Sequence, residues 1–139
     1  MRISLWNSGT LQEVSRQASA SLSVETRGCE AIDLTPTLEN WLHSLGVRDG
    51  ALTLFCRHTS ASLTVQENAD PRVQSDLIDA LEALAPQSRD WRHAQEGPDD
   101  MPAHVKTSLT DASLTVPDGL LEHRCHPHRR DVRLHFLGS

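Results

Sequence analysis

The chain has 139 residues, enough for one domain with a modest core, and its 19 acidic and 13 basic residues give a formal net charge of −6 with histidine neutral. This balance disfavours nucleic-acid binding, which needs a basic surface. No apolar run approaches the roughly 18 residues that span a bilayer, and the segment MRISLWNSGT lacks the apolar region of a signal peptide, so we expect a cytoplasmic protein with no membrane partner.

The first third of the chain predicts a hairpin. Residues 1–18 are the hardest to assign and are interpreted as an N-terminal extension with a short edge strand and a turn. The segment SASLSVET alternates through Leu22 and Val24 and reads as a strand. A turn containing Gly28 separates it from a second strand over residues 29–34, and the two together predict a β-hairpin.

The segment DLTPTLENWLHSLG predicts the first helix. Thr35 is the expected N-cap, Pro36 the first helical residue and Gly46 the residue that ends the helix. The apolar residues of this segment recur at helical spacing and should face the core: Leu38, Trp41, Leu42 and Leu45.

Two strands and a second helix follow. ALTLFCRH and SASLTVQE both read as strands and are interpreted as a second hairpin. ADPRVQSDLIDALEALAP predicts the second helix, with Asp70 as N-cap and Pro71 at its first position. Its expected inward-facing residues are Val73, Leu77, Leu81 and Leu84.

The last part of the chain predicts a loop, a short helix and two strands. Residues 87–104 read as a loop, and VKTSLTDASLTVP as a short helix followed by a strand. VRLHFLG predicts the closing strand through Val132, Leu134 and Phe136. Helices interleaved with hairpins indicate a compact α+β fold in one domain, residues 1–139, and not a doubly wound parallel sheet.

The segment RHTSASLTVQENADP gathers polar side chains at a strand end. His58, Thr59 and Ser60 offer one imidazole and two hydroxyls that can hold an anion or orient a water molecule. Helix capping explains Asp70 from its position alone. Glu67 is a stronger candidate for chemistry, because the turn before the helix does not need a carboxylate.

The segment HAQEGPDDMPAH has prolines that forbid one continuous helix through it. His93 and Glu96 have H-x-x-E spacing, and His104 follows the proline-broken loop. Together with His58, three imidazoles and a carboxylate suit an open Zn²⁺, Mn²⁺ or Ni²⁺ site. The same groups can instead bind phosphate or transfer protons, and a solvated surface loop accounts for the spacing equally well.

The run HRCHPHRR is the basic cluster of the chain. Its charges can protect an edge strand from aggregation. Alternatively, the planar guanidinium groups of Arg129 and Arg130 can clamp a phosphate.

Taken together, HTSASLTVQENADPRVQSDL, WRHAQEGPDDMPAHVKTSLT, SLTVPDG and the final PHRR resemble the YjbQ family (UPF0047) over roughly residues 20–139. The resemblance implies a compact α+β domain that assembles as a homotrimer. It also implies a secondary thiamine-phosphate synthase activity, which joins a pyrimidine pyrophosphate to a thiazole phosphate and releases pyrophosphate. The residues that it carries over are His58, Thr59, Ser60, Glu67, Asn68, Asp70, His93, Glu96, Gly97 and His104. Asp100 stands where many members have Asn.

The leading hypothesis is therefore a trimeric enzyme acting on small phosphorylated molecules. The expected catalytic residues are His58, Glu67 and Glu96. Substrate binding is assigned to Thr59, Ser60, Asn68, Asp70, Gly97, Arg129 and Arg130. His58, His93 and His104 are the expected ligands of a divalent metal, zinc or a similar ion, or magnesium brought with pyrophosphate. The alternatives are a metal-assisted phosphoester hydrolase and a non-enzymatic trimer that binds a small phosphorylated metabolite.

One departure from the family pattern follows SLTVPDG. The family continues into a Gly-Thr-Trp-Gln element, whereas here Gly119 passes directly to LLEHRCHPHRR. Either the gene is shortened or a segment is missing from the printed sequence. The second interpretation is favoured, because a true deletion would remove a central strand or a wall of the site from a small core.

Overall fold

The computed structural model describes residues 3–4, 11, 13–66, 70–115, 119–122 and 127–139. Ten elements follow one another in this part of the chain: β1 (Arg16–Glu25), β2 (Glu30–Ile32), α1 (Thr35–Leu45), β3 (Gly50–Cys56), β4 (Ala61–Thr64), α2 (Pro71–Leu84), α3 (Asp100–Ser108), β5 (Ser113–Leu114), β6 (Gly119–Glu122) and β7 (Arg129–Gly138). Within it, no helix has both the length and the apolar character that crossing a membrane requires. The expected α+β class is confirmed.

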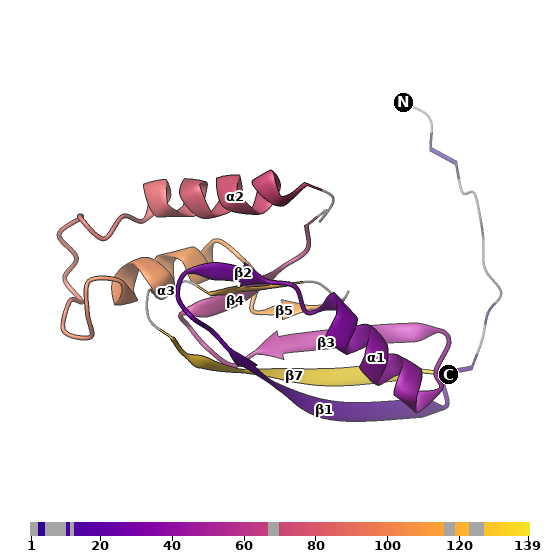
Figure 1. Cartoon of the computed structure of the whole chain (residues 1–139). Helices are drawn as coiled ribbons and strands as arrows, with labels where there is room; N and C mark the ends of the chain where they lie inside the picture. The colour runs from indigo at the N-terminus through magenta and orange to yellow at the C-terminus, as the bar shows by residue number, and fades with distance from the viewer. Residues whose placement is uncertain (1–2, 5–10, 12, 67–69, 116–118, 123–126) are drawn as a thin grey trace.

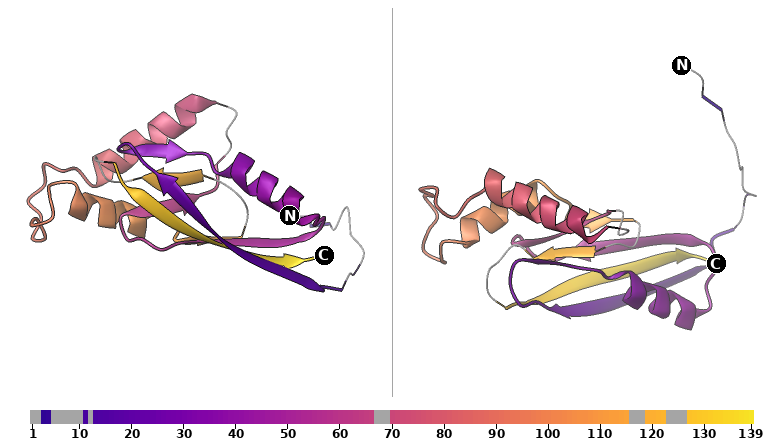
Figure 2. Two further views of the ribbon diagram at one scale, coloured as in Figure 1. Left: turned by 60° about the horizontal axis from the view of Figure 1, so that its bottom comes forward. Right: turned by 45° about the horizontal axis from the view of Figure 1, so that its top comes forward.

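The strands form two antiparallel sheets. The larger sheet has the order β1-β7-β3-β5, and the smaller one has the order β2-β6-β4. Figures 1 and 2 show α1 beside one end of the larger sheet, whereas α2 and α3 lie together over the smaller sheet at the opposite end of the molecule. The two ends therefore have different surroundings, and α3 belongs to the end covered by two helices.

The core lies on the inner face of the larger sheet. Every second residue of β7 is buried, from Arg130 through Phe136, because side chains alternate between the two faces of a strand. Leu38 of α1 packs into the same cluster as buried residues of β3 and β7. The predicted alternation of the closing strand is confirmed.

The first helix forms as predicted, with a correction at its start. Helix α1 begins at Thr35, so Leu34 is the N-cap, and the predicted capping role of Thr35 is wrong. Asp33 Oδ1 accepts the Thr35 backbone N–H at 2.9 Å and provides a side-chain partner just before the helix. Gly46 ends α1 in the left-handed region, φ 63°, where glycine carries no Cβ penalty.

Both predicted hairpins are wrong, although their strands exist. Strand β1 pairs with β7 and β2 pairs with β6, in different sheets. Strand β3 pairs with β7 and β5, while β4 pairs with β6. A short turn between two strands favours their pairing. Here strands that are distant in sequence pair instead, and the two sheets that result bury apolar residues in one common core.

The predicted loop over residues 87–104 is also corrected at its end. Helix α3 already begins at Asp100 and includes Pro102 as its third residue. Proline is tolerated there because the first backbone N–H groups of a helix have no intrahelical partner. Gly97, with φ 109°, shapes the turn before the helix.

Helix α2 forms as predicted but buries less of its apolar face. Leu81 is buried and Leu77 is half-buried, whereas Val73 and Leu84 are 40% and 65% exposed. Val73 and Leu84 are therefore not buried in the single chain, and the inward orientation predicted for them is wrong.

Strand β6 occupies the centre of the smaller sheet. It begins at Gly119, the last residue of the family-like SLTVPDG segment, and it pairs with β2 and β4. The central position of this sheet is thus filled by the printed sequence, although residues 116–118 and 123–126 on either side lie outside the described part.

Candidate metal centre

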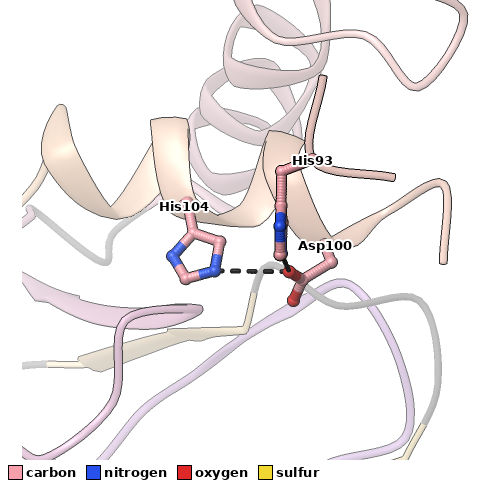
Figure 3. A group of neighbouring side chains, drawn as sticks. All are labelled: His93, Asp100 and His104. Carbon is pink, nitrogen blue, oxygen red and sulfur yellow. Dashed lines mark hydrogen bonds and ion pairs between the residues drawn. The ribbon is translucent and has the colours of Figure 1, made fainter. Parts of the chain in front are cut away.

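Helix α3 and the loop before it bring three side chains together. Asp100 and His104 stand four residues apart on α3 and therefore project from the same face of the helix. His93 reaches the same point from the preceding loop (Figure 3). The loop before α3 thus returns close to the helix's first turn.

The three side chains meet at one carboxylate oxygen. His93 Nε2 lies 3.0 Å from Asp100 Oδ2, and His104 Nε2 lies 3.3 Å from the same oxygen. Their potential ligand atoms all lie within 4.8 Å of one another. The imidazole centroids are 6.0 Å apart and the ring planes are inclined by 73°, so the two rings converge edge to face on the carboxylate.

We call this group the His93–Asp100–His104 cluster. Its carboxylate is buried, whereas its two imidazoles are partly exposed to solvent. The Asp100 side chain is 3% exposed, that of His104 34% and that of His93 48%. Solvent therefore reaches the cluster from the side of His93. A buried carboxylate with two accessible imidazoles leaves room for a further ligand.

The donor set fits a divalent transition metal. Metal–nitrogen bonds of about 2.0–2.1 Å in tetrahedral geometry hold neighbouring ligand atoms about 3.3 Å apart. The separations of 3.0 and 3.3 Å between the imidazole nitrogens and Oδ2 are hydrogen-bond or ion-pair distances and also lie close to this spacing. Two histidines and one carboxylate suit zinc or iron(II) sites that keep positions open for water or substrate.

An ion pair between a buried lysine and a half-exposed glutamate holds α3 behind the cluster. Lys106 Nζ pairs with Glu82 of α2, and Lys106 is 2% exposed. Thr110 Oγ1 donates to the Lys106 carbonyl at 2.9 Å and lies 2.5 Å from Ser62 Oγ of β4. Helix α3 is therefore held against both α2 and the smaller sheet, which limits the movement of Asp100 and His104.

His58 lies in a separate group that also contains predicted site residues. His58 Nε2 accepts the Asp131 backbone N–H at 3.0 Å, and Nδ1 lies 3.3 Å from Arg130 Nη1. Arg130 is buried and donates from Nη2 to the Ser60 carbonyl at 3.3 Å. We call His58, Ser60 and Arg130 the His58–Arg130 cluster.

The expected convergence of three histidines is therefore found only for two of them within one chain. His93 and His104 come together, and the third ligand beside them is Asp100 instead of His58. Glu96 is exposed on the loop and is not part of the ligand group.

Three other predicted site residues, Thr59, Asp70 and Arg129, are exposed or partly exposed. Thr59 is exposed at the bend before β4. Arg129 donates from Nε to Ser23 Oγ at 2.6 Å and is exposed. Asp70 caps α2, as predicted, by accepting the Arg72 backbone N–H at 2.9 Å. Glu67 and Asn68 lie outside the described residues.

Asp100 is the candidate ligand that sequence reasoning missed. Its D-x-x-x-H spacing to His104 places both on one helical face, but this signal is meaningful only if Asp100 is helical. The sequence predicts a loop over residues 87–104, and in a loop this spacing does not bring two side chains together.

Comparison with known proteins places these features in a family. A family model described as "UPF0047 protein YjbQ-like" matches residues 20–122. The UPF0047 protein sll1880 of Synechocystis is 39% identical over 138 residues, which covers 89% of this chain and 94% of that protein. The UPF0047 protein YjbQ of Escherichia coli O157:H7 is 38% identical over 102 residues, covering 73% of this chain and 72% of that protein.

Solved structures share the fold. The hypothetical protein APE1520 of Aeropyrum pernix K1 superposes with a TM-score of 0.77 at 26% identity, covering 88% of this chain and 99% of that one. The conserved hypothetical protein TT1486 of Thermus thermophilus has a TM-score of 0.70 at 31% identity, covering 83% of this chain and 97% of that one.

Proposed function

Because this chain belongs to the UPF0047 YjbQ-like family, we propose that it binds a divalent metal at the His93–Asp100–His104 cluster and acts there on a small phosphorylated compound. The observation that carries the proposal is the approach of two imidazole nitrogens to one buried carboxylate oxygen at metal-ligand spacing. The exposed side of His93 gives a substrate access to the cluster.

The charge of the protein supports a metal. A chain with a formal charge of −6 supplies little positive field to a phosphate, and departure of phosphate or pyrophosphate develops negative charge. A bound divalent ion would neutralise that charge. Asp100 holds both imidazoles in position, and loss of their Nε2 protons makes these nitrogens available as ligands.

The His58–Arg130 cluster is proposed as an anion-binding group. Its guanidinium is held by the Ser60 carbonyl and faces the His58 ring. A guanidinium suits a phosphate because its planar donors match two oxygens at once, and an anion bound here would replace the contacts of Arg130 with His58 and the Ser60 carbonyl. Thr59 and Arg129 lie near this cluster in sequence and are proposed to assist binding.

Within this class, the particular reaction that the family resemblance implies is thiamine-phosphate synthesis with release of pyrophosphate. Glu96, Glu67 and His58 are the proposed acid–base residues. The same metal cluster and acid–base residues also suit metal-assisted hydrolysis of a phosphoester. A non-enzymatic trimer that binds a phosphorylated metabolite would need the anion contacts but no acid–base residue.

The metal proposal is tested by calorimetric titration of Zn²⁺ and Mn²⁺ into protein stripped with a chelator, together with elemental analysis after dialysis. Wild-type protein should bind one ion per chain. Asp100→Asn removes the charge at nearly constant shape, and His104→Ala removes one ligand. Both should weaken binding at least ten-fold, because a neutral amide oxygen is a weaker ligand than a carboxylate and His104→Ala leaves only two of the three ligands.

His135→Ala is the matched control. His135 is an exposed histidine on β7 whose Nε2 lies 3.3 Å from Gln17 Oε1, outside the ligand group. Its substitution should leave metal affinity unchanged. Wild-type affinity in Asp100→Asn, or equal weakening by His135→Ala, would contradict a specific centre. Pyrophosphate binding followed by a turnover assay on the same sample then separates an enzyme from a binder.

A further inference from the structure

The loop that carries His93 also walls a recess of about 230 Å³. Its lining residues are Gln87, Arg89, Asp90, Trp91, His93, Ala94, Gly97 and Pro98. His93 thus belongs both to this recess and to the His93–Asp100–His104 cluster. A molecule held in the recess would lie directly beside the metal ligands.

Trp91 has the largest side chain of the recess lining, and a hydrogen bond fixes the orientation of its indole. Its indole N–H donates to the Pro86 carbonyl at 3.0 Å, so this polar atom is already satisfied. The guanidinium carbon of Arg89 lies 4.7 Å from the ring centroid. Arg89 therefore covers one face of the indole, and a ligand ring can stack on the other indole face or on the outer face of the guanidinium, but it cannot use the indole N–H.

The size and chemistry of the recess select a small ring. Its volume is below the 300–1,000 Å³ typical of sites for drug-sized ligands, so it suits roughly one ring. Gln87 and Asp90 add an amide and a carboxylate at its wall. An indole and a guanidinium both stack well on planar aromatic rings. A puckered aliphatic ring is not flat and cannot stack on them in this way.

We propose that this recess beside His93 binds one planar aromatic ring of the substrate, with the substrate's phosphate directed toward the metal centre. Trp91 and Arg89 are then specificity residues. This inference rests on the proposed function for the phosphate, but the ring preference can be measured by itself.

The test compares phenyl phosphate, cyclohexyl phosphate and inorganic phosphate by calorimetry on full-length protein, with and without zinc. Cyclohexyl phosphate has a similar size and is at least as apolar, so simple burial gives no preference for phenyl. Wild type should bind phenyl phosphate about five-fold more tightly than cyclohexyl phosphate. Trp91→Leu should abolish this preference while leaving zinc affinity and inorganic phosphate binding unchanged.

Arg89→Gln provides a second variant, because Arg89 is exposed and its loss should not prevent folding even if Trp91→Leu does. It should reduce the phenyl preference. Arg92→Gln is the control, since Arg92 is an exposed neighbour that does not line the recess, and it should keep the full preference.

The outcomes separate the two proposals. Zinc binding with equal affinities for phenyl and cyclohexyl phosphate overturns the ring site and leaves the metal centre standing. A Trp91-dependent phenyl preference without any zinc binding supports the ring site and overturns the metal centre. A preference that survives in both Trp91→Leu and Arg89→Gln, or no binding of phenyl phosphate at all, overturns the ring site.

Discussion

At the scale of single residues, Lys106 is a lysine whose side chain is almost completely buried. It is 2% exposed, and its ammonium pairs with Glu82, whose side chain is 37% exposed. The two partners therefore differ in their access to water. Removing the buried charge and removing its partner should have different consequences, because a buried charge without its partner retains its full desolvation cost.

Glu82→Gln is expected to lower the free energy of unfolding by about 3 kcal/mol, since it leaves the buried ammonium without its counter-charge. Lys106→Met should cost less than about 1 kcal/mol, because methionine fills a similar volume and water can solvate Glu82. Urea unfolding at neutral pH measures both. The double variant should resemble Lys106→Met. A Lys106→Met variant at least as destabilised as Glu82→Gln would contradict this interpretation.

Glu96 tests whether the loop before α3 takes part in chemistry. Glu96→Gln keeps size and hydrogen bonding but removes the charge, so an acid–base role predicts a loss of about 10²–10⁴ in turnover. Metal content should not change, because Glu96 lies outside the ligand group. Steady-state assays of pyrophosphate release provide the measurement. Wild-type turnover in a folded, metal-loaded variant would leave Glu96 as a surface residue.

At the scale of elements, α2 depends strongly on its N-terminus because little of its surface is buried. Leu81 is the one residue of α2 that is buried. Asp70 accepts the Arg72 backbone N–H, and its two carboxylate oxygens also receive the Arg72 guanidinium at 2.8 to 3.1 Å. The Arg72 side chain first, and its backbone N–H second, hold the pKa of Asp70 below the ordinary value of 3.8.

This lowered pKa predicts a pH dependence with a definite sign. The stabilisation from ionised Asp70 is present above pH 3.8 and is lost as the pH falls below 3.8 through the pKa of the folded state. Asp70→Asn retains a capping side chain but not the charge. The melting temperature of wild type should therefore exceed that of Asp70→Asn slightly at pH 6, and the difference should vanish at strongly acid pH.

Asp79→Asn on the same helix is the control, because it removes one exposed carboxylate without affecting the cap. High salt should also reduce the wild-type advantage, since the Asp70–Arg72 pair is at the surface. A difference between wild type and Asp70→Asn that is constant from pH 6 to acid pH would disprove the role of the charge.

The elements also show what local sequence signals can predict. Asp70-Pro71 and Gly46 marked a helix start and a helix end, because caps act through neighbouring backbone groups. Strand partners were not predictable in this way, since β1 pairs with β7 across almost the whole chain. Asp100 was missed for a related reason: its proximity to His93 depends on how the loop folds back on α3, which no spacing rule encodes.

At the scale of the whole molecule, large apolar side chains remain on the surface of one chain. Phe55 and Leu137 are 49% and 47% exposed on the larger sheet, and Leu84 is 65% exposed on α2. Contact with another copy of the chain would remove the apolar area of these side chains from water. They support the expectation of self-association, which the family resemblance specifies as a trimer.

We therefore expect a particle of three times 15.4 kDa in solution. Light scattering coupled to size-exclusion chromatography measures this mass, and a dilution series through the micromolar range tests its stability. A mass of one subunit at micromolar concentration would exclude the trimer. A mass of two subunits would retain self-association but change its symmetry.

The position of β7 between β1 and β3 has a consequence for the protein during its synthesis. Residues 16–25 leave the ribosome early, but their hydrogen-bonding partners are residues 129–138. At ordinary translation rates the interval is on the order of 10 seconds. Throughout it, β1 and β3 have no shared neighbour, and the larger sheet cannot form. The larger sheet is therefore expected to form only after β7 has left the ribosome, and until then the nascent chain must remain soluble with β1 unpaired.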